Sequence, residues 1–212
     1  MRRPDWQPSR IYCVGRNYAD HAREMGADPS REAPFFFSKP ADALVSGNVP
    51  YPSLTRDFQH EVELVVALGR GGADLSLTDA AACIDAYAVG IDWTRRDLQA
   101  EAKRLGRPWD TAKGFDYSAS IGPLCPREAA GDINDADIEL TVNGVRRQSG
   151  NIRQMIWSVP EIIAELSRYY CLKSGDLIYT GTPAGVAAVN IGDDILARVT
   201  GLEPLQLTIV AR

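Results

Sequence analysis

Two glutamates stand two positions apart in an apolar run of the chain, Glu61 and Glu63 within His60-Glu61-Val62-Glu63-Leu64. In a strand such residues share one face, with Cα atoms roughly 6.6 Å apart. Two carboxylates on an apolar strand repel each other and resist desolvation. A divalent cation between them removes both problems, and oxygen ligands favour Mg²⁺, Mn²⁺ or Ca²⁺ over zinc. The alternative is an ordinary solvent-facing side of an antiparallel strand.

Asp92 is a third candidate ligand because it ends the apolar stretch 87–91. Together with the two glutamates it would form a site for a hard metal ion, with positions open to water and a chelating substrate. The alternative is that Asp92 caps the helix expected soon after it. In that helix, Arg96 and Gln99 lie three residues apart and therefore on one face.

A lysine and a histidine–glutamate pair are candidates for charge stabilisation and proton transfer. Lys113 is flanked by small and aromatic residues and could be held against a developing anion, although a solvated loop lysine is the alternative. His21 and Glu24 lie three residues apart in a helix predicted over 19–25. That spacing lets the carboxylate orient the imidazole as a general base for water. A surface His–Glu pair is the alternative.

The segment 179–185, Tyr-Thr-Gly-Thr-Pro-Ala-Gly, follows a predicted strand and offers hydroxyls and backbone N–H groups to an anion. It is not a P-loop, because the chain contains no G-x-x-x-x-G-K-[ST], and it contains no G-x-G-x-x-G either. A G-x-S-x-G nucleophile elbow is also absent. Nucleotide-dependent chemistry therefore has no motif to support it.

The elements that must position these side chains predict an α+β fold weighted toward strands. The Asn143-Gly144 pair between two β-rich segments predicts a hairpin. Pro160 predicts the start of an amphipathic helix. Strands are predicted over 11–14, 35–37 (buried), 61–68, 88–91, 138–142, 145–148, 176–179, 195–199 and 205–210, and helices over 19–25, 79–87, 95–105 and 159–170.

Length and composition fit one globular domain with a sizeable core. The chain has 212 residues, of which 45% are hydrophobic and 24% charged. Lys and Arg number 23 against 28 Asp and Glu, so the net charge is 23 − 28 = −5. Nucleic acid and anionic membrane surfaces require a basic face, and neither is expected as a partner.

The cysteines predict a reducing environment. All four stand singly, without a C-x-x-C pair, which argues against a structural zinc site and a disulfide framework. The N-terminal residues do not resemble a secretory signal, and no apolar run approaches the ~18 residues of a membrane span. A cytoplasmic protein is the expectation.

Six motifs, in their order along the chain, resemble the fumarylacetoacetate hydrolase family. The resemblance extends from about residue 10 to the C-terminus, and the chain looks most like the bacterial fumarylpyruvate hydrolases of gentisate degradation and the related acylpyruvases. The motifs occupy residues 14–21, 37–40, 60–64, 92–99, 112–116 and 180–186.

The resemblance implies a mixed β-sandwich roll with its site at the mouth of the sheets, usually in a homodimer. Residues 1–212 would form one catalytic domain, in which 1–50 make an N-terminal lobe carrying a lid helix. It also implies Mg²⁺ or Mn²⁺, with Ca²⁺ as a further candidate, on Glu61, Glu63 and Asp92.

The implied substrate is a 2,4-diketo acid, fumarylpyruvate, cleaved to fumarate and pyruvate through a metal-stabilised pyruvate enolate. Arg96 and Gln99 would hold this small molecule, and Thr182 with its turn would bind its carboxylate. Arg16 or Arg95 would meet the distal carboxylate.

The resemblance also implies that His21 with Glu24 activates water on a closing lid helix, while Lys113 stabilises the developing negative charge. Oxaloacetate decarboxylation, and isomerisation or hydration of a 2-hydroxy-dienoate, are alternatives on the same site, because they share the metal-stabilised enolate. A non-catalytic binding protein that keeps the fold is an alternative of another class.

Overall fold

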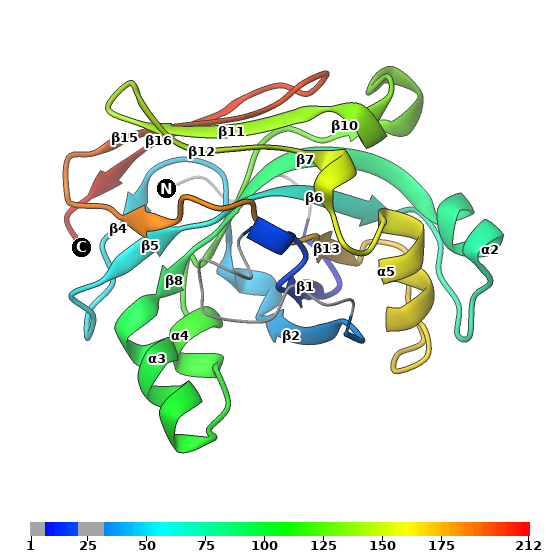
Figure 1. Cartoon of the computed structure of the whole chain (residues 1–212), viewed down its shortest axis with the longest axis horizontal. Helices are drawn as coiled ribbons and strands as arrows, with labels where there is room; N and C mark the ends of the chain where they lie inside the picture. The colour runs from blue at the N-terminus through cyan, green and yellow to red at the C-terminus, as the bar shows by residue number, and fades with distance from the viewer. Residues whose placement is uncertain (1–6, 21–31) are drawn as a thin grey trace.

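The computed structural model describes residues 7–20 and 32–212. Within them the chain forms sheets of eight, five and three strands, accompanied by short helices. The five-stranded sheet lies over the large sheet, while α3 (Arg96–Leu105) and α4 (Asp110–Lys113) stand to one side and α2 (Leu77–Ala82) and α5 (Val159–Leu166) to another (Figure 1). The predicted α+β class, weighted toward strands, is confirmed.

The large sheet is mixed and runs in the order β2-β1-β13-β6-β7-β9-β3, with β10 pairing to β7. Strand β1 is parallel to β13, and β3 is parallel to β9, whereas the other pairs are antiparallel. Its strands are β1 (Ile11–Gly15), β2 (Phe35–Lys39), β3 (Leu44–Val45), β6 (Val62–Leu68), β7 (Ile84–Asp92), β9 (Ala119–Ile121), β10 (Cys125–Pro126) and β13 (Leu177–Tyr179).

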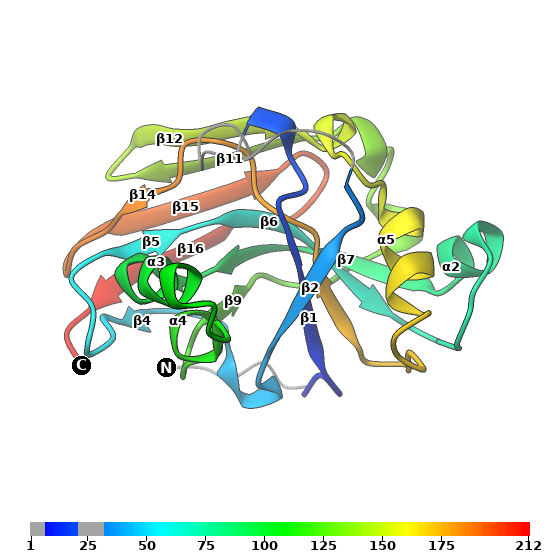
Figure 2. The ribbon, with the colours of Figure 1, turned by 60° about the horizontal axis from the view of Figure 1, so that its bottom comes forward.

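The other two sheets cover and extend the large one, as Figure 2 shows for the five-stranded sheet. The five-stranded sheet has the order β12-β11-β15-β16-β4, and the three-stranded sheet has the order β14-β5-β8. Their strands are β4 (Val49–Pro50), β5 (Phe58–His60), β8 (Thr94–Arg95), β11 (Asp137–Val142), β12 (Val145–Asn151), β14 (Ala187–Ala188), β15 (Asp194–Val199) and β16 (Leu205–Val210).

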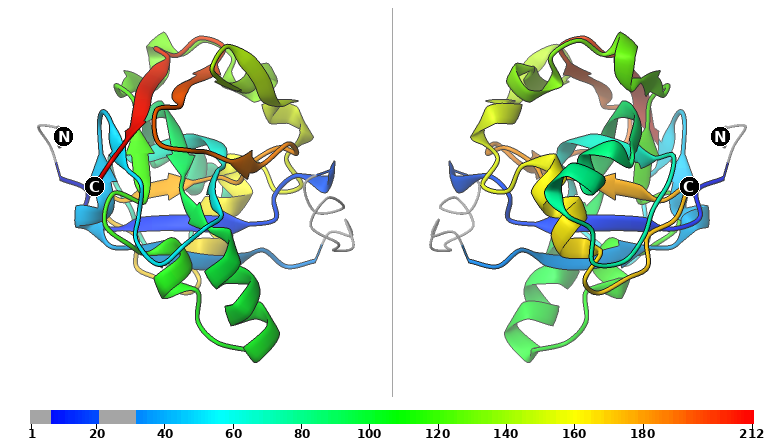
Figure 3. Two further views of the ribbon diagram at one scale, coloured as in Figure 1. Left: turned by 90° about the vertical axis from the view of Figure 1, so that its left-hand side faces the viewer. Right: turned by 90° about the vertical axis from the view of Figure 1, so that its right-hand side faces the viewer.

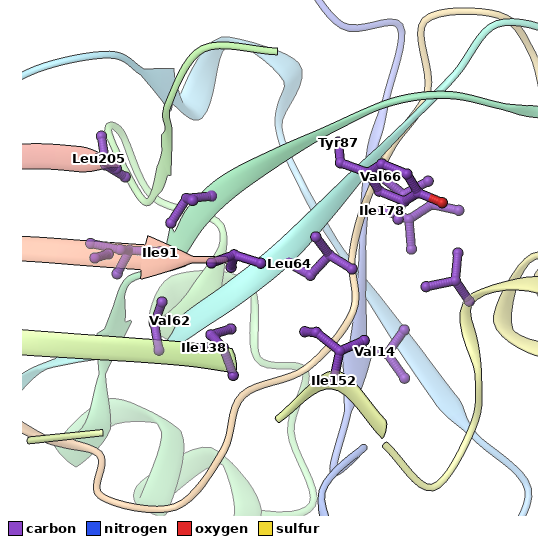
Figure 4. Packing of buried hydrophobic residues seen from close by; sticks show 14 of the residues in the cluster. Val14, Val62, Leu64, Val66, Tyr87, Ile91, Ile138, Ile152, Ile178 and Leu205 are labelled. Carbon is purple, nitrogen blue, oxygen red and sulfur yellow. The ribbon is translucent and has the colours of Figure 1, made fainter. Parts of the chain in front are cut away.

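The main hydrophobic core lies between the large sheet and the five-stranded sheet. Val62, Leu64 and Val66 alternate along β6 and pack with residues of the facing strands, among them Ile138 and Leu205 (Figure 4). All five are at most 4% exposed. Burying side chains of this size contributes about 1.5–3 kcal/mol each, so this layer fixes which way β6 faces.

The opposite face of the large sheet closes on itself. Tyr179 of β13 donates its hydroxyl hydrogen to the Ser120 carbonyl of β9 at 2.9 Å, although β6 and β7 lie between those strands. The ring crosses above Gly90, where a Cβ atom would lie 2.8 Å from it. The sheet is therefore strongly curled, and Gly90 permits the crossing because it has no side chain.

The short helices begin and end where local chemistry dictates. Ser158 and Glu161 form a capping box at the start of α5, and Gly106 in a left-handed conformation ends α3. Figure 3 shows α3 and α4 projecting from the sheets. The described residues also form 3₁₀ turns: η1 (Ala41–Ala43), η2 (Arg127–Ala129), η3 (Ile133–Asp135) and η4 (Ile152–Gln154). No helix within the described ranges is long and apolar enough to cross a membrane.

Several predicted elements match the structure and others differ. The hairpin at Asn143-Gly144 is confirmed, and both residues have positive φ. The helix predicted over 79–87 is wrong beyond Ala82, because residues from Ile84 onward pair with β6. The helix predicted over 159–170 ends at Leu166, and the strand predicted as buried at 35–37 is half-buried. The lid helix predicted over 19–25 lies largely outside the described residues.

Candidate metal centre and active site

Strand register brings the three predicted carboxylates together. Glu63 on β6 pairs with Gly90 on β7, so the two residues point to the same face of the sheet. Asp92 lies two positions after Gly90 and Glu61 two positions before Glu63, which places all three carboxylates on that face. One oxygen from each carboxylate lies within 4.8 Å of the others. The structure therefore unites the three residues that sequence spacing singled out.

The cluster is buried, so the alternative of a solvent-facing strand side is wrong. Glu61, Glu63 and Asp92 are 5%, 2% and 0% exposed, and β6 is buried at every position. Asp92 does not cap a helix either, since the N-cap residue of α3 is Arg95. Buried carboxylates require compensating positive charge or hydrogen-bond donors. Their surroundings supply both.

Three cationic side chains surround the carboxylates. Lys113 Nζ lies 2.7 Å from Glu61 Oε2 and 2.8 Å from Asp92 Oδ2, at the end of the short helix α4. Lys39 Nζ lies 2.7 Å from Asp92 Oδ1. Arg96 Nη2 lies 2.5 Å from Glu61 Oε1. Lys113 is 2% exposed, which rules out the solvated loop lysine.

Within residues 7–20 and 32–212, Glu63 has no such cation among its hydrogen-bond partners. Its Oε2 accepts from the Gly181 N–H at 2.7 Å. Burial raises the pKa of Glu63 well above its ordinary value, and the charges of Asp92 and Glu61 raise it further. For Lys113, burial lowers the pKa, but Asp92 and Glu61 outweigh it and the net shift is upward. The ammonium therefore stays charged, while burial disfavours the anionic form of Glu63.

Arg96 and Gln99 lie on one face of α3, as their three-residue spacing predicted, and that face is turned to the carboxylate cluster. Arg96 Nη1 donates to Gln99 Oε1 at 2.7 Å, and Arg96 Nε donates to Gln59 Oε1 at 2.7 Å. With its bond to Glu61, the guanidinium is held on three sides. Because Gln99 Oε1 accepts from Arg96, the Gln99 amide group directs its N–H donors elsewhere.

The turn between β13 and β14 lies against the same strand. Thr180 Oγ1 donates to the Leu64 carbonyl at 2.8 Å, and the next residue, Gly181, donates to Glu63. Gly181 has φ +99°, and a Cβ atom there would lie 2.7 Å from Asn17 Cβ. Thr182, the predicted carboxylate-binding residue, follows directly and is 2% exposed. The turn is thus fixed one residue away from the carboxylate cluster.

The remaining predicted site residues are placed differently. Arg16 is exposed, has φ 56°, and lies over the Phe35 ring at 5.2 Å. Arg95 lines a cavity of about 350 Å³ with Tyr51, Phe115 and Arg212, and none of the three carboxylates lines that cavity. His21 and Glu24 lie outside the described residues.

Sequence reasoning about single residues missed two buried polar groups. Lys39 carries a charge into the cluster from β2, and the only sign of it in the sequence was its place in the motif at residues 37–40. Gln148 joins His60 to Thr182 from β12, with nothing in the local sequence to indicate it. Both act at long sequence separation, which no local spacing reports.

The cluster fits a divalent metal ion. The ligand atoms would all be carboxylate oxygens, the donors preferred by Mg²⁺, Mn²⁺ and Ca²⁺. Glu63 accepts from the Gly181 N–H but pairs with no cation among the described residues, and burial, followed by the charges of Asp92 and Glu61, raises its pKa, so its negative charge is poorly stabilised. A hard cation would balance it.

Known proteins with a similar sequence or fold include hydrolases and a decarboxylase. A crystal structure of fumarylpyruvate hydrolase from Pseudomonas aeruginosa, in complex with Mn²⁺ and pyruvate, is 50% identical and superposes with a TM-score of 0.94, covering 97% of this chain and 91% of that one. A fumarylpyruvate hydrolase from Ralstonia is 45% identical over 86% of this chain and 95% of the relative. The mitochondrial oxaloacetate decarboxylase of Dictyostelium discoideum is 39% identical over 98% and 97%.

The match to the family covers almost the whole chain, including every carboxylate and cation of the cluster. The family model described as fumarylacetoacetate (FAA) hydrolase C-terminal matches residues 10–210, so this protein belongs to the fumarylacetoacetate hydrolase family and has its mixed-sheet fold.

Proposed function

We propose that this protein is a metal-dependent hydrolase that cleaves the C–C bond of a 2,4-diketo acid, converting fumarylpyruvate to fumarate and pyruvate. The observation that carries the proposal is the buried cluster of Glu61, Glu63 and Asp92 with the Lys113 ammonium between two of them. The 50% identity to a fumarylpyruvate hydrolase that holds Mn²⁺ and pyruvate supports the choice of substrate.

Glu61, Glu63 and Asp92 would hold Mg²⁺ or Mn²⁺. When bound, the ion supplies Lewis-acid stabilisation of negative charge on the pyruvate half of the substrate. The chain's own contribution is positional. Lys113 and Arg96 are fixed by ion pairs to the same carboxylates, so their charges are preorganised before substrate arrives.

Substrate oxygens would be held from two sides. The Gln99 amide accepts from Arg96 through its oxygen, which leaves its N–H groups to donate to a substrate oxygen. The Thr182 hydroxyl, on the turn anchored to Glu63 by Gly181, would bind the substrate carboxylate. Arg16 would meet the distal carboxylate. Arg16 and Arg96 lie close enough to Lys103 for both charges to lower its pKa, after the larger effect of burial, and this proximity supports the role.

Water would be activated by His21, oriented by Glu24, as their spacing predicts. The imidazole would take one proton from water as the oxygen adds to C4. The C3–C4 bond would then break, with its electron pair remaining on C3, while Lys113 balances charge at the oxyanion. The imidazolium would return its proton to C3, which gives pyruvate and a carboxylic acid.

Oxaloacetate decarboxylation is the second candidate, favoured by the Dictyostelium relative at 39% identity over nearly the whole chain. It would use the same carboxylates and Lys113 but needs no attacking water. His21→Ala separates the two reactions. If hydrolysis is lost while decarboxylation persists, His21 is the base for water; equal loss of both would contradict that role.

The direct test is the fall in ultraviolet absorbance of enolised fumarylpyruvate with purified protein and Mn²⁺, compared with an EDTA-treated sample. Rapid, chelator-sensitive decay with pyruvate appearing supports the hydrolase. The same samples are then given oxaloacetate. A folded, metal-loaded protein that decarboxylates oxaloacetate but leaves fumarylpyruvate unchanged would overturn the hydrolase in favour of the second candidate.

The cysteines and the family resemblance support a proposal for the location and assembly of the enzyme. Cys13, Cys83, Cys125 and Cys171 are all free thiols, as in proteins of a reducing compartment, and a cytoplasmic location is proposed. The single catalytic domain over 1–212 with an N-terminal lobe at 1–50, and its assembly as a homodimer, stay as proposals from the family resemblance.

A further inference from the structure

The Gln148 side chain on β12 joins the strand that carries the glutamates to the turn that carries Thr182. It is fully buried and makes four hydrogen bonds. Its Oε1 accepts from the Val62 N–H at 3.0 Å and lies 2.8 Å from His60 Nδ1. Its Nε2 donates to Thr182 Oγ1 at 2.7 Å and to the Pro183 carbonyl at 2.8 Å. Every hydrogen-bonding position of the amide is therefore used.

Two backbone partners fix which end of the amide is which. The Val62 N–H can only donate, and the Pro183 carbonyl can only accept. A flipped amide would place nitrogen against the N–H and oxygen against the carbonyl, so the oxygen must face Val62. His60 Nδ1 must then carry a hydrogen, because Gln148 Oε1 only accepts.

The orientation of the Gln148 amide also determines whether the Thr182 hydroxyl donates or accepts in their hydrogen bond. Gln148 Nε2 has no lone pair to accept a hydrogen bond, so Thr182 Oγ1 accepts and its own proton points elsewhere. Within the part of the chain that the structure describes, this hydroxyl has no acceptor. A buried O–H donor without a partner is costly, and an incoming anion would satisfy it.

We propose that Gln148 is a positioning residue that aims the Thr182 hydroxyl proton at the substrate carboxylate; this inference rests on the carboxylate-binding role of Thr182 in the proposed function. The residue acts through Thr182 and does not itself touch substrate. Because Gln148 makes the hydroxyl a donor, the hydroxyl can donate to a substrate carboxylate oxygen, and hydrogen bonds to charged acceptors are the stronger ones.

The turn is held in place by other contacts, so the role of Gln148 can be separated from that of the backbone. Gly185 packs so closely on β12 that a Cβ atom would lie 2.1 Å from the Arg147 carbonyl oxygen. A Cβ atom built at Gly150 would lie 2.8 Å from Pro183 Cβ. Thr180 and Gly181 hold the other end through β6. Replacing Gln148 should leave the turn where it is.

The experiment is a double-mutant cycle with Gln148→Met and Thr182→Val in Mn²⁺-loaded protein, read as KM and kcat for fumarylpyruvate and as the dissociation constant of pyruvate by calorimetry. Each single variant is expected to raise KM and the pyruvate dissociation constant about 10-fold, with kcat changed less than threefold. In the Thr182→Val background, Gln148→Met should add less than twofold. The exposed Gln206→Met is the matched control.

The outcomes separate this inference from the proposed function. If Gln148→Met weakens binding equally with and without the Thr182 hydroxyl, Gln148 is only structural and the inference is overturned. If Thr182→Val leaves both constants unchanged, the proposed role of Thr182 fails first. Gln148→Glu is the second variant, because its carboxylate would accept from Thr182 and reverse the hydroxyl; wild-type binding there, or loss of folding in both variants, contradicts the inference.

Discussion

The substitution Glu63→Gln tests the metal site most directly because it removes a charge and little else. Glutamine has the size of glutamate, and its oxygen can still accept from the Gly181 N–H, now 2.7 Å from Glu63 Oε2. The anchor between β6 and the turn is therefore kept. What disappears is a buried negative charge that faces Asp92 and Glu61.

In metal-free protein this removal should stabilise the fold. Burial, followed by the charges of Asp92 and Glu61, raises the pKa of Glu63. An acid whose pKa is higher in the folded state keeps its proton to a higher pH there. The free energy of unfolding therefore falls as pH rises from the unfolded pKa to the folded pKa. Each pH unit between the two values costs about 1.4 kcal/mol. A buried group without adequate partners costs about 1–3 kcal/mol, so the variant should be more stable than the wild type by about that amount at pH 8 and should lose this pH dependence.

The assay is denaturant unfolding of EDTA-treated wild type and Glu63→Gln at pH 5, 6.5 and 8, followed by Mn²⁺ titration in a calorimeter. Losing a charged ligand should weaken Mn²⁺ binding by at least ~100-fold, more than typical outer-shell changes. Mn²⁺ affinity of the wild type should rise with pH, because the ion displaces a proton from Glu63. Glu203→Gln, an exposed position, is the control for net charge.

Two results would refute the reasoning. Mn²⁺ affinity within threefold of the wild type would mean that Glu63 is not a ligand. A metal-free variant less stable than the wild type at pH 8 would mean that the carboxylate is well stabilised as an anion, contrary to its surroundings in the structure.

Other predictions follow from the same contacts. Lys113→Met leaves Glu61 and Asp92 without their shared partner and should cost the metal-free fold about 3–5 kcal/mol, part of it restored by Mn²⁺ in thermal melts. Gly90→Ala inserts a Cβ 2.8 Å from the Tyr179 ring and should cost about 1–3 kcal/mol in denaturant unfolding; an unchanged midpoint would contradict the curled sheet. Light scattering should give twice the mass of one chain if the homodimer forms, and a single-chain mass would disprove it.

The sequence by itself determined features that depend on near neighbours. The two-residue spacing of Glu61 and Glu63 placed them on one face, and the three-residue spacing of Arg96 and Gln99 did the same on a helix. The Asn-Gly hairpin and the capped start of α5 are likewise local, because a few residues satisfy their own backbone geometry. The order of the six motifs along the chain also indicated the family.

Tertiary structure decided the surroundings of these residues. The pattern of β6 could not separate a half-buried strand from one buried on both faces, and only the curled sheet packed against a second sheet settles that. Asp92 joins the glutamates because Glu63 pairs with Gly90, and register is a non-local property. Lys39 and Gln148 reach the site from β2 and β12, which local spacing could not indicate. Their placement follows from the need of buried charges and amides for partners, which only the folded chain brings within reach.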